Sequence, residues 1–421
     1  MLFSGRRAIQ NLEGTPMSVF ARILSESFRI FFLATLISAI VLLGVWLWIY
    51  SADLMGLGST EFPFAPAAMH WHAHEMIFGF ATAAVGGFFL TAVPNWTGAA
   101  GARSRFIGTA AALWLAARIA VWFSGLLPPG VVAIICLAFL PFLGARIAML
   151  LFKRPKPQNV ILLAVLALIW AGELLVQADW MGWSWGDSGR GLRVALLALV
   201  ALIAVIGGRV TPAFTRNAMI RTGREHDLPA SGGRLDLAGS AAAIATAGLA
   251  ALPIPEVIPG AAACIAGALA LIRLARWQSR WTRPFAILWT LHLSYGLLGL
   301  GLIALGLSWM GIGSEIAAIH LLGIGGTGGM ILSVLSRASL GHTGRPLIAP
   351  RPVAIAYALI PSAAVLRWLA PQAGTLEPLL TIAAGLLWLA GFSLALAAMG
   401  PILTAPRAPR EPAPPVPPHR S

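Results

Sequence analysis

Three histidines and a carboxylate open one apolar segment of this chain. The run is His70-Trp71-His72-Ala73-His74-Glu75-Met76, and apolar residues follow it almost without interruption to position 93. Ionisable groups are costly in lipid and normally face a protein interior, where they bind something. Residues four apart share a helix face, which places His70 beside His74. Because imidazole suits copper, zinc and iron alike, the run predicts a metal or haem centre.

The composition is that of a multi-span membrane protein. Of 421 residues, 58% are hydrophobic and only 10% are charged, and the mean hydropathy is +0.83. A net charge of +14 would suggest nucleic acid in a soluble protein, but here the basic residues gather in alternate connections between apolar runs. Both cysteines, Cys136 and Cys264, lie inside apolar runs, which argues against a disulfide framework and against iron–sulfur clusters.

At about 20 apolar residues for each crossing, the sequence predicts an all-α bundle of about twelve transmembrane helices. The expected spans are 27–50, 70–93, 106–127, 130–152, 158–180, 191–210, 235–253, 256–274, 284–309, 312–338, 350–370 and 377–400. Lysine and arginine precede the first span and follow every second one, so both termini are expected in the cytoplasm. Residues 1–26 form a cytoplasmic segment, 27–400 the membrane domain, and the Ala/Pro-rich residues 401–421 a disordered tail. No internal repeat is evident.

The orientation converts sequence position into depth, at ~1.5 Å for each helical residue. The candidates expected in the outer half are His70, His72, His74, Glu75, Arg118, Glu173 and His320. His292 is expected nearer the midplane, and His342 at the inner edge. These groups form either one elongated centre or two separate centres, and the sequence leaves both open.

Each candidate has a simpler interpretation. His292 alone could bond a neighbouring carbonyl, and Arg118 with Glu173 could be a structural ion pair, the alternative being that Arg118 holds a haem propionate. The glycines between 323 and 329 favour close helix packing over room for a macrocycle. A haem needs one or two axial histidines among apolar walls, whereas a copper ion takes several imidazoles. The chain has enough histidines for both.

Three motifs give the chain a resemblance to the NnrS family. They are Trp71-His72-Ala73-His74-Glu75-Met76 with the following 87–98 segment, the segment Gly208-Arg209-Val210-Thr211-Pro212, and Leu340-Gly341-His342-Thr343-Gly344-Arg345. The resemblance covers the apolar chain in order and leaves only the tails outside. It implies a polytopic, haem- and copper-containing protein of the bacterial inner membrane, associated with denitrification and protection from nitric oxide.

The resemblance also assigns residues. His72 and His74 match the first motif, His342 matches the last, and His292 and His320 match histidines expected in the ninth and tenth spans. The expected cofactor-binding residues are His292, His320, His342 and Arg118, for haem b, and the expected metal ligands are His72, His74, His320, His70 and Glu75. His70 precedes the motif, and the division of ligands between haem and copper stays open.

The leading prediction is a haem and copper membrane protein that binds and turns over nitric oxide, a possible nitric oxide reductase-like enzyme. One alternative is a proton- or metal-coupled transporter that uses the same groups as a relay. Another is a sensor or store that binds the gas without turnover. No nucleotide or nucleic-acid site is expected, because the glycine-rich segment lies within a span and lacks a P-loop lysine.

Overall fold

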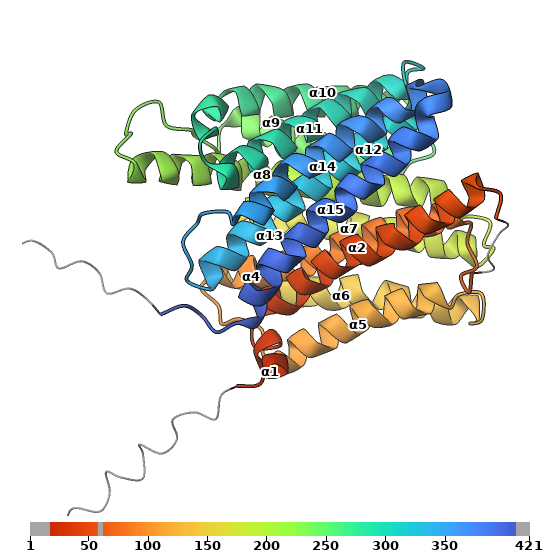
Figure 1. Cartoon of the computed structure of the whole chain (residues 1–421), viewed down its shortest axis with the longest axis horizontal. Helices are drawn as coiled ribbons and strands as arrows, with labels where there is room; N and C mark the ends of the chain where they lie inside the picture. The colour runs from red at the N-terminus through yellow and green to blue at the C-terminus, as the bar shows by residue number, and fades with distance from the viewer. Residues whose placement is uncertain (1–16, 58–61, 410–421) are drawn as a thin grey trace, which may run out of the picture.

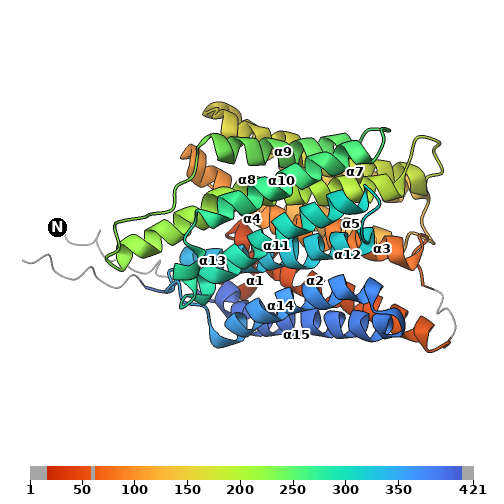
Figure 2. The ribbon, with the colours of Figure 1, turned by 90° about the horizontal axis from the view of Figure 1, so that it is seen from above.

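The computed structural model describes residues 17–57 and 62–409, and all regular structure in that part of the chain is helical. The long helices lie side by side in one bundle (Figures 1 and 2). The prediction of an all-α polytopic bundle is therefore confirmed. Residues 1–16 and 410–421, which hold much of the two predicted terminal segments, lie outside the described residues, as does His419.

The helices follow the predicted spans closely. Their bounds are α1 (Val19–Ile23), α2 (Ser27–Leu54), α3 (Ala68–His74), η2 (Glu75–Ala81), α4 (Thr82–Thr97), α5 (Ser104–Trp122), α6 (Pro129–Lys153), α7 (Pro157–Trp180), α8 (Ser188–Arg221), α9 (Arg234–Ala250), α10 (Val257–Ala275), η3 (Ser279–Thr282), α11 (Ala286–Ser308), α12 (Glu315–His320), η4 (Leu321–Gly328), α13 (Gly329–His342), α14 (Arg351–Leu369), η5 (Ala370–Gln372), η6 (Gly374–Leu376) and α15 (Glu377–Thr404). Within the described residues, eleven helices are long and apolar enough to cross a membrane.

The difference from twelve lies at α9, a helix of 17 residues that is rich in alanine and glycine. It coincides with the predicted seventh span and packs against α8 and α10. Several helices continue beyond the predicted spans: α8 ends 11 residues later than expected, at Arg221, and α2, α4, α13 and α15 each end four residues later. Hydropathy marks only the apolar part of a helix, so it does not find a polar continuation beyond the lipid.

Arg29 links the start of α2 to the end of α15 through hydrogen bonds. Its guanidinium donates to the carbonyl oxygens of Leu403 and Ala405, at 2.7 and 2.8 Å. The start of α2 and the end of α15 thus lie at the same end of the bundle. The cytoplasmic location of that end stays a prediction.

Paired glycines let the closest helices touch through their backbones. Lipid gives apolar helices little reason to associate, so packing in membranes depends on small residues at the contact. A Cβ atom at Gly172 of α7 would lie 2.6 Å from the carbonyl oxygen of Gly191 in α8, and one at Gly267 of α10 would lie 2.5 Å from that of Gly299 in α11. Larger side chains at these positions would push the helices apart.

The packing divides the bundle into three successive units of four helical segments. The units are α2 to α6, α7 to α10 and α11 to α15, where α3, η2 and α4 count as one segment, as do α12, η4 and α13. The last helix of each unit packs on the first helix of the next, through the pairs α6 with α7, α10 with α11, and α15 with α2. Among the middle helices of the units, α8 contacts η2 and η4, and α4 contacts α13, so we call α4, α8 and α13 the inner helices.

The three inner helices also end alike. Each ends at a threonine or one residue before it, and that threonine is followed by a glycine of positive φ: Gly98 (67°), Gly223 (82°) and Gly344 (74°). The threonine hydroxyls of Thr97, Thr222 and Thr343 each donate to the carbonyl oxygen four residues earlier. His74 and His320 both lie 23 residues before their terminal threonine, and the equivalent residue of α8 is Leu199. The recurrence gives the two histidines equivalent positions in their helices.

Candidate functional site

Both of these histidines stand where a helix changes its winding. α3 ends at His74 and α12 ends at His320, and a π-helical segment follows each: η2 after His74 and η4 after His320. Short π segments inside α-helices are rare and occur frequently at functional sites. The side chain of Trp114 stabilises η2 by donating to the carbonyl oxygen of Gly79, at 3.0 Å. The two π-helical segments therefore single out His74, before α4, and His320, before α13, as candidate positions for a site.

His74 lies in a closed ionic cluster. The side chain is fully buried, and its Nδ1 lies 3.0 Å from Oε1 of Glu75 while its Nε2 lies 2.9 Å from Oε1 of Glu173. Gln177 donates to the same oxygen of Glu173, at 2.9 Å. Both ring nitrogens can donate to these carboxylates only when the imidazole carries two protons. In this arrangement neither nitrogen is free to bind a metal.

Arg118 completes the charge balance of this cluster. It donates through Nη1 to Oε1 of Glu75 at 2.5 Å, and not directly to Glu173 as the sequence interpretation proposed. Two carboxylates then face one guanidinium and one imidazolium, so the buried charges sum to zero. Gly79 makes the space, since a Cβ atom there would lie 3.2 Å from the Arg118 side chain. A neutral, hydrogen-bonded group of this kind is the form in which charges are tolerated away from water.

His72 points to a different environment, because residues two apart on a helix do not share a face. Its ring stacks on Trp46 of α2, with centroids 4.7 Å apart, and its buried Nδ1 has no hydrogen-bond partner among the described residues. It lies within electrostatic range of His320 and Arg367. We call His72, His320 and Arg367 the open cluster, because each has a nitrogen without a protein partner.

His320 has the geometry of a metal-binding histidine. Its Nδ1 donates to the carbonyl oxygen of Ile316 at 2.7 Å, which leaves Nε2 without a hydrogen-bond partner in the described part of the chain. A bond of this kind at the other ring nitrogen fixes the tautomer and the ring orientation of metal-binding histidines. One turn further on, a Cβ atom at Gly323 would meet nothing within 4 Å. The Nε2 atom is therefore available, with space nearby.

Arg367 of α14 brings a cation to the same place. Its buried Nη1 has no partner among the described residues, and the side chain is within range of Tyr50 and Glu377 without a salt bridge to either. An arginine with a free donor is suited to bind a carboxylate. The sequence interpretation missed this residue, although an arginine inside a predicted span is itself a signal.

His292 and His342 lie elsewhere. His292 is buried in α11, and both of its ring nitrogens are hydrogen-bonded. Nε2 lies 2.8 Å from the hydroxyl of Thr215, and Nδ1 lies 2.8 Å from the hydroxyl of Ser279. His342 is half-buried at the end of α13 and stacks on Phe28, with centroids 5.3 Å apart. The simpler interpretation of His292 expected a bond to a neighbouring carbonyl, whereas both of its partners are side-chain hydroxyls.

The candidates thus separate into groups and do not form a single shell. His70 is half-buried on α3 and has no hydrogen bond among the described residues. Over residues 17–57 and 62–409, no group of three or more His, Cys, Asp or Glu side chains is placed to hold a metal ion. Of the five glycines between 323 and 329, four pack against neighbouring helices and only Gly323 faces open space. The described residues thus offer His72 and His320 as histidines with an unbonded nitrogen, whereas three or more imidazoles that could share a copper ion are not gathered among them.

Comparison with known proteins identifies the family of the chain. None of the curated proteins matches the chain significantly. The family model described as NnrS protein matches residues 22–407, which includes every predicted span and both histidine clusters. The chain belongs to the NnrS family.

Proposed function

We propose that this protein binds haem within the membrane and uses it to bind and turn over nitric oxide. The observation that carries the proposal is the open cluster, in which two histidines of different inner helices have free nitrogens beside an unpaired arginine. Family membership adds to it, since the family is associated with the response to nitric oxide. The proposed location is the bacterial inner membrane.

Each residue of the open cluster would have a separate task. His72 and His320 would be the two imidazoles able to bind the haem iron, with nitric oxide taking the place of one of them, and Trp46, stacked on His72, would hold its ring in place. Arg367 would pair with a propionate of the macrocycle through its free guanidinium nitrogen. When bound, a haem supplies an iron that takes nitric oxide as a ligand and exchanges electrons with it.

The closed cluster would support this site without binding the cofactor. His74 joins α3 to α7 through Glu173, and Glu75 joins the same helix to α5 through Arg118. These bonds fix the rotation of α3, and hence the direction of His72. Copper, expected from the family resemblance, has no matching set of three ligands in the described residues, so no step is assigned to it.

The test is an optical and electron paramagnetic resonance spectrum of the purified protein, recorded with and without nitric oxide. We expect a Soret band that shifts when the gas binds, together with metal analysis that reports iron and copper separately. His72→Ala and His320→Ala should each lower the haem content, whereas His226→Ala, in the loop after α8, should not. A protein that lacks haem when expressed with an adequate haem supply would refute the proposal.

Turnover is tested separately, by nitric oxide consumption with an electron donor present. Gas binding without consumption would indicate a sensor or store. Proton- or metal-coupled flux in proteoliposomes made from haem-free protein would instead support a transporter.

A further inference from the structure

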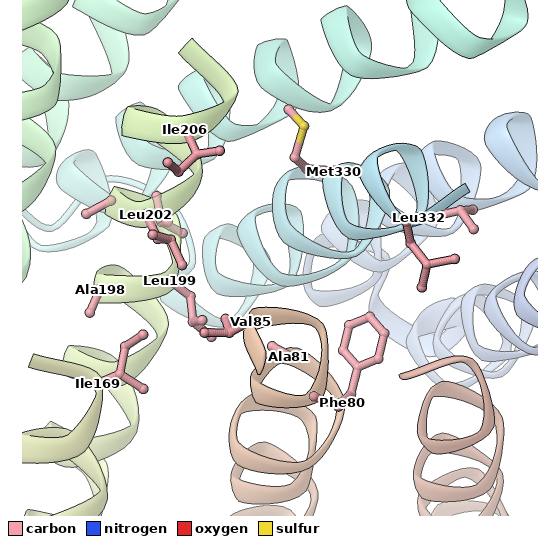
Figure 3. Close-up of a cluster of buried hydrophobic side chains, with 14 of the residues drawn as sticks. Phe80, Ala81, Val85, Ile169, Ala198, Leu199, Leu202, Ile206, Met330 and Leu332 are labelled. Carbon is pink, nitrogen blue, oxygen red and sulfur yellow. The ribbon is translucent and has the colours of Figure 1, made fainter. Parts of the chain in front are cut away.

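A small cavity lies among the inner helices, below the histidine clusters. Its volume is about 70 Å³, and its walls come from α2, α4, α8, η4 and α13. Figure 3 shows part of this region, with Val85 of α4 facing Leu199 of α8 and with Met330 contributed by α13. The cavity is formed where the three units of the bundle meet.

The walls of the cavity are apolar. Among the lining residues, the one side-chain polar atom is the hydroxyl of Thr327, which is buried and has no hydrogen-bond partner in the described part of the protein. An ordered water needs two to four polar partners, so water is poorly held here. The volume is several times the roughly 10–15 Å³ that one water needs. The cavity is therefore suited to a small apolar molecule.

The opening of the cavity is also apolar. Most lining residues are buried, and the half-buried ones are Phe88, Ile203, Ile331 and Val334. A polar solute from water would meet no hydrogen-bonding group at this opening. An apolar gas dissolved in the hydrocarbon of the bilayer would enter without losing any.

The position of the cavity connects it with the histidines. Thr327 lies seven residues after His320 on the same helix, about 10 Å deeper at 1.5 Å for each residue. Leu199, the residue of α8 equivalent to His74 and His320, forms part of its wall. Gly207, also in the wall, lies beside Tyr295 of α11, the helix that carries His292. The cavity thus lies between the outer histidines and the inner one.

We propose that this cavity is a docking site for a small apolar diatomic gas that enters from the bilayer. The apolar walls, the single unpaired hydroxyl and the apolar opening carry this inference. The identity of the gas as nitric oxide rests on the proposed function, but the existence of the site does not.

Xenon is the probe that tests the site, because it is apolar, monatomic and visible in crystals under pressure. Crystals of the full chain, grown from lipid and exposed to xenon, should show density between Val85, Leu199 and Met330. Val85→Phe should fill the cavity and abolish that density. Ile203→Phe, at the opening, should lower its occupancy. Leu196→Phe is the matched control: Leu196 is half-buried on α8, as Ile203 is, but lies outside the cavity wall and should leave the density unchanged.

The outcomes separate the site from the function. Xenon density that persists in Val85→Phe, or that never forms in the wild type, would overturn the proposal. Xenon bound in a protein without haem or nitric oxide chemistry would keep the site and refute the proposed function. If both hold, the association rate of nitric oxide should fall in Val85→Phe and Ile203→Phe but not in Leu196→Phe. Equal rates in all three variants would show that the gas does not pass through the cavity.

Discussion

Replacing His74 with alanine should destabilise the protein without removing a cofactor ligand. The imidazole is fully buried between Glu75 and Glu173, and without it two carboxylates face the single guanidinium of Arg118. Removing one partner of a buried, hydrogen-bonded ion pair costs about 3–5 kcal/mol, because the remaining charge has neither solvent nor a counter-charge. We therefore expect His74→Ala to unfold at a clearly lower temperature than the wild type.

His72→Ala is the matched comparison on the same short helix. Its ring stacks on Trp46 and has a buried nitrogen without a partner, so its loss leaves no charge uncompensated. We expect a smaller loss of stability but a loss of haem. The assay combines thermal unfolding, followed by the fluorescence of the 16 tryptophans in the chain, with the Soret absorbance of each variant in the same detergent.

A second substitution checks the electrostatic reasoning. In His74→Ala/Glu173→Gln, the missing positive charge is matched by a missing negative one, so Glu75 and Arg118 remain as a balanced pair. The double variant should regain part of the stability that His74→Ala loses. If the double variant is less stable still, or if His74→Ala keeps its unfolding temperature but loses haem, the charge-balance argument is wrong and His74 acts as a ligand.

Other substitutions test the packing and the open cluster. Gly208→Ala should lower stability by about 1–3 kcal/mol in a thermal unfolding assay, because its Cβ would overlap the buried guanidinium of Arg273; a variant as stable as the wild type would show that Arg273 can move aside. Gly248→Ala, whose Cβ meets nothing within 4 Å, should leave the unfolding temperature unchanged or raise it slightly. Arg367→Leu should weaken haem retention during dialysis and Arg367→Lys should weaken it less, so equal retention in both would remove the arginine from the site. His226→Ala should be silent in every assay, and haem loss there would contradict the assigned cluster.

The sequence predicted the helices and the layer of ionisable groups because both depend on local composition. About 20 apolar residues mark a crossing whatever surrounds them, so the bounds of α6 and α7 were expected within one residue. Glu75 and Glu173 were placed at similar depth for the same reason. The α9 segment shows the limit, since the predicted seventh span of 19 residues forms a helix of only 17 residues.

Which polar groups meet could not be predicted in this way. Depth alone does not give the rotation of a helix, and the rotation decides that Arg118 bonds Glu75 and not Glu173. The π-helical turns after His74 and His320 were also not predicted, because they are imposed by packing and have no compositional signal. Arg273 and Arg367 could have been found, since each is an arginine inside a predicted span.

The equivalent placement of His74 and His320 in two of the four-helix units shows that one position can serve two purposes. In the first unit the imidazole is bonded by acidic neighbours and joins helices. In the third unit the same position keeps a ring nitrogen unbonded, and in the second unit the equivalent residue is Leu199, which lines the cavity. Exchanging the acidic neighbours between the first and third units would therefore be a direct route to moving the ligand-binding capacity from one helix to the other.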